Sequence, residues 1–191
     1  MTNDHEGAPQ TRASTVRTLR VYQGRVLNLD IDQVRFPDGS IGDLELIRHS
    51  GAAAVVPFLD DPRSPEARVL LIRQYRYAAD RFLYEIPAGR LAPDEHPADC
   101  ARRELLEEAG CTAESLTRLG GFFTTPGFID EYIHLYLASG LTRGDANPEP
   151  DEFIQPVSHT LQEILRMMDR GEIVDGKTIV ALCMVDRLIR Q

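Results

Sequence analysis

Three acidic residues, Glu104, Glu107 and Glu108, have a spacing that could bind a metal ion. If the segment is helical, each residue advances by roughly 100°, so the three carboxylates share one arc of the helix surface. Their repulsion would cost a few tenths of a kcal/mol per pair, and a divalent cation would remove that cost. Mg²⁺ takes oxygen ligands, often carboxylates together with waters and substrate phosphates. The spacing therefore indicates a metal site, although such a run alone is also typical of a solvated helix face.

The helix that would carry these acids has clear start and stop signals. Pro97 suits a first helical turn, and Gly110 suits the left-handed residue that ends a helix. These signals predict a helix from about Pro97 to Ala109. A neighbouring arc of this helix is apolar and is expected to pack on a core; its members are Ala98, Ala101, Leu105 and Ala109.

A longer pattern surrounds the acids and has many fixed positions. These are Gly89, Glu95, Arg103, Glu104, Leu105, Glu107, Glu108, Gly110 and Cys111. The pattern resembles the Nudix box, with Cys111 an unusual choice for the final apolar position. The resemblance implies that Gly89 lets the loop bend under the helix and that Glu95 supports this loop.

The same resemblance implies a metal centre and roles for its residues. The catalytic Mg²⁺ or Mn²⁺ would be held by Glu104, Glu107, Glu108 and the backbone carbonyl of Ala88. Arg103 would orient the carboxylates.

A second segment, a turn with an acid on its far side, resembles the ADP-ribose pyrophosphatase subfamily. It consists of Pro126, Gly127 and Phe128, with Glu131 following. The resemblance implies that this turn binds substrate and that Glu131 approaches its terminal ribose. Without that context, the segment reads simply as a turn between two strands.

Two arginines and an acidic loop complete the candidate site. Arg73 and Arg76 end an apolar segment, where a guanidinium could clamp a diphosphate bidentately. Strand alternation places them on opposite faces, so we expect one of the two to bind substrate. The loop from Asn147 to Glu152 precedes a short strand, and the resemblance implies that Glu152 acts as general base. Its composition is otherwise typical of a solvated loop.

The function implied by the resemblance is Mg²⁺-dependent hydrolysis of ADP-ribose to AMP and ribose 5-phosphate. Hydrolysis of another nucleoside diphosphate sugar or of a nucleoside triphosphate is an alternative. A domain that senses a nucleotide without cleaving it belongs to a different class. The complete acidic cluster counts against a sensor, which has no need of it.

The expected fold class is α/β, an α/β/α sandwich with a mixed sheet at residues 51–191. Residues 1–15 are polar, without periodicity, and are expected to be disordered. Alternating residues and a Pro-Asp-Gly turn predict a small antiparallel β-sheet at 16–50. Such a sheet is too small to be stable alone, so it should pack on the main domain or on a second subunit. The resemblance favours a homodimer.

Other patterns predict the remaining elements of the sandwich. Strands are expected at residues 119–123, 132–138 and 153–154, and helices at about 161–169, capped by Thr160, and 177–190.

Composition excludes several classes of protein. The 21 Lys and Arg against 30 Asp and Glu give a formal net charge of -9, which argues against binding to a nucleic-acid backbone. No apolar run approaches the roughly 20 residues of a membrane helix, and the N-terminus lacks the apolar core of a signal peptide. The three cysteines form no CxxC pair and are expected to be reduced and mostly buried. We therefore expect a cytoplasmic protein without a disulfide framework.

Overall fold

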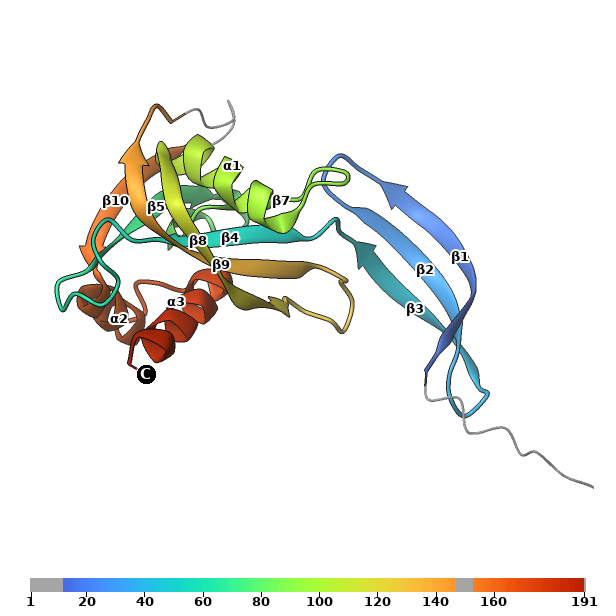
Figure 1. Cartoon of the computed structure of the whole chain (residues 1–191). Helices are drawn as coiled ribbons and strands as arrows, with labels where there is room; N and C mark the ends of the chain where they lie inside the picture. Colours follow the sequence, from blue (N-terminus) through green and yellow to red (C-terminus); the bar gives the residue numbers. More distant parts are fainter. Residues whose placement is uncertain (1–11, 147–152, 191) are drawn as a thin grey trace, which may run out of the picture. The chain divides into compact units, whose positions relative to one another are not determined.

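The computed structural model describes residues 12–146 and 153–190, which form two compact units (Figure 1). The first unit comprises the described part of Met1–His49 together with Phe123–Glu131. The second comprises Ser50–Phe122 and the described part of Tyr132–Gln191. Each unit is described by itself below.

The first unit is built on a three-stranded antiparallel sheet in the order β1-β2-β3. Its strands are β1 (Ser14–Gln23), β2 (Asn28–Arg35) and β3 (Ile41–Arg48). The antiparallel sheet predicted from the alternating pattern is therefore confirmed.

Two of the buried residues of this sheet, both on β2, are acidic. Asp30 and Asp32 are 2% and 4% exposed, whereas many of the apolar side chains of β1 are solvent-exposed. Arg20 pairs with Asp30, and Arg48 pairs with both aspartates. Thr18 donates its hydroxyl proton to Asp32 at 2.7 Å. The two acids can be buried because cations and a hydroxyl from the neighbouring strands satisfy them.

The described residues of the second unit form two sheets and three α-helices. One sheet has the order β10-β5-β6, and the other has the order β7-β4-β9-β8. The strands are β4 (Ala52–Pro57), β5 (Arg68–Arg76), β6 (Arg81–Glu85), β7 (Ala88–Arg90), β8 (Cys111–Phe123), β9 (Tyr132–Arg143) and β10 (Ile154–Thr160). The helices are α1 (Pro97–Ala109), α2 (Leu161–Asp169) and α3 (Gly176–Ile189), and a short 3₁₀ turn, η1 (Tyr77–Ala79), joins β5 to β6.

Strand β4 lies at the centre of this unit and is buried along its whole length. Ala53 and Val55 belong to the core cluster that packs on α1, whereas Ala54 and Val56 belong to the cluster of α2 and α3. The strand runs parallel to β9 and antiparallel to β7, so its sheet is mixed. Figure 1 shows α1 on one side of the sheets and α2 and α3 on the other. This arrangement confirms the predicted α/β sandwich.

The helix boundaries agree closely with the sequence patterns, and the strand boundaries agree less well. Thr160 caps α2 by accepting the Glu163 N–H at 3.2 Å, as the capping pattern predicts. Strand β8 begins directly after α1, earlier than expected, and β10 extends to Thr160 although it contains Pro156. Proline is tolerated there because β10 is the edge strand of its sheet.

The cysteines depart from expectation at one position. All three are free; Cys100 and Cys111 are buried, but Cys183 on α3 is exposed. None of the described helices is long and apolar enough to cross a membrane.

Candidate active site

Helix α1 begins and ends at the residues that the sequence indicates. The His96 side chain caps the first turn by accepting the Ala98 N–H at 3.2 Å, and Pro97 follows it. Gly110 ends the helix with φ of 60°, in the left-handed region that glycine adopts without strain. Ala101 and Leu105 pack into the core, which turns the acidic arc of the helix toward β7 and the loop after it.

Arg103 is the centre of the polar contacts on α1. Its guanidinium binds both carboxylate oxygens of Glu95, at 2.9 and 3.0 Å, and donates to the Arg90 carbonyl at 3.1 Å. The same side chain binds Glu104 and reaches Glu107 at 3.0 Å. Arg103 therefore ties the loop before the helix to the acids on the helix.

Glu104 lies directly against the main chain of Gly89. A Cβ on Gly89 would stand 1.8 Å from Oε1 of Glu104, a separation that no atom pair can adopt without bonding. Glu104 is 8% exposed. The absence of a side chain on Gly89 therefore makes room for this carboxylate, which differs from the bending role that the resemblance implies.

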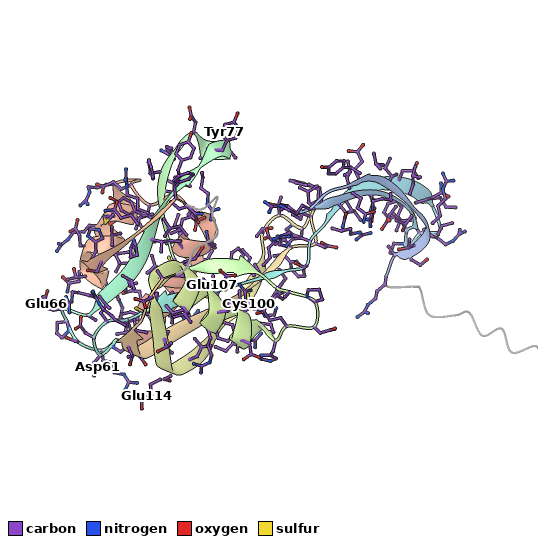
Figure 2. All side chains as sticks on the ribbon, turned by 90° about the horizontal axis from the view of Figure 1, so that it is seen from above. Asp61, Glu66, Tyr77, Cys100, Glu107 and Glu114 are labelled. Carbon is purple, nitrogen blue, oxygen red and sulfur yellow. The ribbon has the colours of Figure 1, made fainter. Side chains whose placement is uncertain are left out.

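Glu108 and Glu107 occupy different environments on the same arc. Glu108 is 2% exposed, and its Oε2 accepts the backbone N–H of Ala88 at 2.8 Å. The Glu107 side chain is more exposed to solvent. Figure 2 labels Glu107 and Cys100, both on α1. Two of the three carboxylates are thus buried against β7, the strand that carries Ala88.

The oxygen donors on α1 are of the kind that a hard divalent cation prefers. The three carboxylates lie on adjoining turns of one helix, and two of them are buried beside the strand that carries Ala88. Within residues 12–146 and 153–190, no three His, Cys, Asp or Glu side chains are grouped as a finished metal site. Arg103 draws Glu104 and Glu107 toward its guanidinium. A bound cation would compete with Arg103 for these oxygens.

Three pKa values around the site, those of Glu95, Arg103 and Cys100, are shifted by hydrogen bonds and by burial. Hydrogen bonds from Arg103 lower the pKa of Glu95 to about 2, and Glu95 in turn raises the pKa of Arg103. Burial raises the pKa of Cys100 to about 12, with a further contribution from the nearby charge of Glu95. Burial therefore favours the neutral thiol form of Cys100.

The two arginines of β5 lie on opposite faces, as alternation predicts. Leu70 on β5 belongs to the same core cluster as Leu105 of α1, and Arg76 lies an even number of residues from Leu70 on the same face. Arg73 faces the other way and stacks over the Phe82 ring at 4.1 Å from its centroid. Arg76 is therefore the arginine on the face of α1.

Arg76 belongs to a charge cluster around the buried Glu85 that the sequence analysis does not identify. Its guanidinium donates to both oxygens of Glu85, at 2.7 and 2.8 Å, and Glu85 also pairs with Lys177. Burial disfavours the ionised form of Glu85, but the bonds from these two cations lower its pKa overall. Glu85 and Lys177 are 92 residues apart in the chain, so no local pattern could have paired them.

The Pro-Gly-Phe turn belongs to the first unit, where it pairs with β3. The Ile47 N–H donates to the Phe128 carbonyl at 2.7 Å, and the Ile47 carbonyl accepts the Asp130 N–H at 3.2 Å. Glu131 lies 3.5 Å from Nδ1 of His49. Phe128 is exposed, and a side chain on Gly127 would meet no atom within 4 Å. The turn therefore presents an open surface within its own unit.

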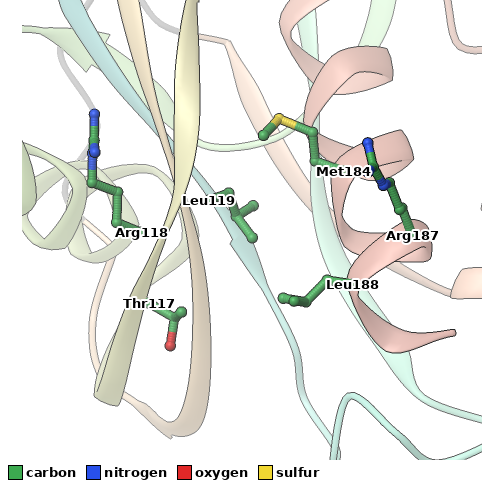
Figure 3. Close-up of a pocket in the computed structure, with 6 residues that line it drawn as sticks. All are labelled: Thr117, Arg118, Leu119, Met184, Arg187 and Leu188. Atoms are coloured by element: carbon green, nitrogen blue, oxygen red, sulfur yellow. The ribbon is translucent and has the colours of Figure 1, made fainter. Parts of the chain in front are cut away.

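Two other regions contribute no described site residue. Glu152 lies outside the residues that the structure describes. A cavity of about 270 Å³ lies between β8 and α3 in the second unit (Figure 3). It is lined mainly by Leu119, Met184 and Leu188, with none of the predicted site residues among its lining.

Comparison with known proteins identifies the family. The NUDIX domain matches residues 48–181, which is more than half of the chain. The chain belongs to the Nudix family. The Gly89 to Cys111 pattern is thus its Nudix box, and it lies within the matched region.

Relatives of this Nudix chain cover most of its length. An ADP-ribose pyrophosphatase of Bacillus subtilis is 35% identical over 170 residues, covering 88% of this chain and 89% of its own. A methanol dehydrogenase activator of Bacillus methanolicus is 38% identical over 170 residues, with the same coverage of both chains. A crystal structure of an ADP compounds hydrolase superposes with a TM-score of 0.79 at 20% identity and covers 94% of this chain and 95% of its own. This structural likeness supports the Nudix fold.

Proposed function

We propose that this Nudix protein hydrolyses the diphosphate bond of ADP-ribose, giving AMP and ribose 5-phosphate, and that the reaction depends on Mg²⁺ or Mn²⁺. The observation that carries the proposal is the arrangement on α1, where Arg103 gathers Glu104 and Glu107 beside the buried Glu108. A surface helix does not need two buried carboxylates, because burying charge is costly unless it serves a purpose. ADP-ribose is proposed as the substrate because two relatives are named ADP-ribose pyrophosphatases.

The proposed metal ligands are Glu104, Glu107, Glu108 and the backbone carbonyl of Ala88. A bound divalent cation would neutralise charge on the diphosphate and lower the pKa of an attacking water. Arg103 would hold the carboxylates in their rotamers before the cation arrives. The Glu108 carboxylate is already held in place, because its Oε2 accepts a hydrogen bond from the Ala88 N–H.

The proposed substrate contacts come from one of the two arginines, Arg73 or Arg76, together with Gly127, Phe128 and Glu131. Of the two arginines, Arg76 is the stronger candidate for the diphosphate because it shares a face of β5 with the residue that packs on α1. Glu131 would bind the terminal ribose through its carboxylate, an acceptor for two hydroxyls. Glu152 would accept the proton of the attacking water.

A homodimer in the cytoplasm is part of the same proposal. The sheet of the first unit exposes large apolar side chains, among them Val16, Leu19, Val21, Tyr22 and Ile41. Apolar side chains gathered on one small sheet are typical of an interface, and a second copy of this chain is the proposed partner. Light scattering of the full chain should give about twice the monomer mass.

A product assay tests the proposed reaction. The wild-type chain is incubated with ADP-ribose, GDP-mannose, NADH or dGTP, with and without Mg²⁺, and the products are separated by chromatography. We expect the highest kcat/KM with ADP-ribose, and no turnover without the metal. NADH and GDP-mannose are included because each also carries a diphosphate between two sugars. Preference for dGTP or NADH would contradict the proposal.

A further inference from the structure

The chain contains a single lysine, Lys177, among its 21 Lys and Arg residues, and the side chain of this lysine is largely shielded from solvent. Its side chain is 13% exposed, whereas Arg20, Arg68, Arg76, Arg166 and Arg190 keep much more of theirs in solvent. Arginine serves every other cationic role in this protein. The one exception suggests that this position requires a compact ammonium rather than a planar guanidinium.

Lys177 sits where helix electrostatics disfavour a cation. It is the second residue of α3, close to the positive end of the helix dipole. Asp175 caps this helix by accepting the Thr178 N–H at 3.0 Å, and it lies 3.1 Å from the Lys177 ammonium. The cap offsets part of the unfavourable interaction. The Lys177 ammonium therefore needs a second anionic partner besides Asp175 to stabilise it at this position.

That partner is Glu85, the last residue of β6. Glu85 is 1% exposed and receives the Lys177 ammonium on the oxygen that also accepts from Nη2 of Arg76. The adjoining residue, Ile86, donates its N–H to the Thr178 hydroxyl at 2.9 Å. An ion pair and a hydrogen bond therefore join the start of α3 to the end of β6. This end of β6 lies a short distance in sequence before Ala88, a proposed metal ligand.

The contact with Glu85 orients the Arg76 side chain. Glu85 occupies its Nε and Nη2, and in the described part of the chain no group binds its Nη1. The pKa of Arg76 is raised by its bonds to Glu85 and, to a lesser extent, by the charges of Glu108 and Asp175. The Arg76 guanidinium thus lies on the α1 face of β5, with Nη1 left open by the contact with Glu85.

We propose that Lys177 is a positioning residue, whose ammonium fixes Glu85 so that Arg76 presents its Nη1 edge to the diphosphate of the substrate. This inference rests on the proposed function. The cluster holds two cations, Arg76 and Lys177, and two anions, Glu85 and Asp175. Removing the Lys177 charge frees Glu85 to draw Arg76 inward, away from the diphosphate, and this change in the position of Arg76 weakens phosphate binding.

A purely structural role for Lys177 makes a different prediction. An ion pair that only joins α3 to β6 would change the melting temperature, but the folded variant would keep the wild-type KM. A positioning residue instead changes KM, and it does so only while Arg76 is present. A double-mutant cycle separates the two roles.

The experiment measures kcat, KM for ADP-ribose and melting temperature in the full-length Lys177→Met and Arg76→Met variants and in the double variant. We expect Lys177→Met to raise KM about tenfold with kcat changed less than about threefold. In the Arg76→Met background, the same change should alter KM by less than about twofold. The matched control is Arg187→Met, which removes an exposed cation from the same helix and should leave KM unchanged.

Two further variants keep the test decisive. If Lys177→Met does not fold, Lys177→Gln retains a hydrogen-bond donor without the charge and is expected to show the same rise in KM. Lys177→Arg keeps the positive charge, but it places a second planar guanidinium beside Arg76 on the Glu85 carboxylate. Its KM is therefore expected to lie between the wild-type value and that of Lys177→Met.

Three results would overturn the inference. An unchanged KM in a folded Lys177→Met or Lys177→Gln variant would do so while leaving the proposed function intact. An equal rise in KM with and without Arg76 would show that Lys177 does not act through Arg76. Failure of the wild-type chain to hydrolyse ADP-ribose would overturn the proposed function, and this inference with it.

Discussion

The Glu104 carboxylate occupies the space that a side chain on Gly89 would need. A Cβ at Gly89 would stand 2.1 Å from Cδ of Glu104 as well as 1.8 Å from its Oε1. A side chain at residue 89 and the Glu104 carboxylate therefore cannot both occupy the space between strand β7 and helix α1. The fixed glycine of the Nudix box has a steric explanation here that is independent of backbone flexibility.

Gly89→Ala should inactivate the enzyme, because Glu104 must leave its position to admit the methyl group. We expect kcat to fall at least about a hundredfold and the free energy of unfolding to fall by about 1 to 3 kcal/mol. Gly176→Ala is the matched control, since a Cβ there meets no atom within 4 Å. Turnover close to wild type in Gly89→Ala would show that the observed contact is not required.

Glu95 should stabilise the fold through its contact with Arg103, with a defined pH dependence. Its pKa is lowered from 4.5 to about 2, chiefly by hydrogen bonds from Arg103, so its contribution is complete above pH 4.5 and is lost as the pH falls toward 2. Urea unfolding should find Glu95→Gln less stable than wild type by about 1 kcal/mol at neutral pH. The difference should shrink below pH 4.5, and a constant difference would contradict the assignment.

Glu131 should discriminate between substrates. If its carboxylate binds the terminal ribose, Glu131→Ala will lower kcat/KM for ADP-ribose by about ten- to a hundredfold and affect GDP-mannose less. The ratio of the two kcat/KM values measures this directly. An equal loss for both substrates would argue that Glu131 supports the turn and does not read the sugar.

Glu152 should act as the general base. A carboxylate that binds metal has its charge committed and is a weaker base, so an acid from the loop is the better candidate. Glu152→Gln is expected to lower kcat by at least about a hundredfold while substrate Kd stays near wild type. Loss of activity in Glu149→Gln or Asp151→Asn instead would assign the role to another residue of the loop.

How much could be predicted depends on whether the signal is local. Pro97 and Gly110 fix the ends of α1 through the backbone preferences of proline and glycine, so sequence alone sufficed there. The extent of β10 could not be predicted from Pro156, because a proline is compatible with a strand only at a sheet edge, and edges depend on the whole topology.

The buried charges could not be predicted either, because their partners are distant in the sequence. Alternation along β2 indicates a strand, but it gives no sign that Asp30 and Asp32 are the buried residues, since their partners come from neighbouring strands. The pairing of Glu85 with Lys177 joins β6 to α3 across most of the second unit's sequence. One cue was available, because Lys177 is the only lysine in the chain.

The central claim is that the carboxylates of α1 bind the metal that drives hydrolysis. Its most direct test measures Mn²⁺ affinity by electron paramagnetic resonance and ADP-ribose turnover in wild type, Glu104→Gln and Glu108→Gln. Each substitution removes an anionic ligand without altering the helix, so we expect Mn²⁺ binding to weaken at least about tenfold and kcat to fall by orders of magnitude, with an unchanged circular dichroism spectrum. Wild-type Mn²⁺ affinity and turnover in both folded variants would contradict the account.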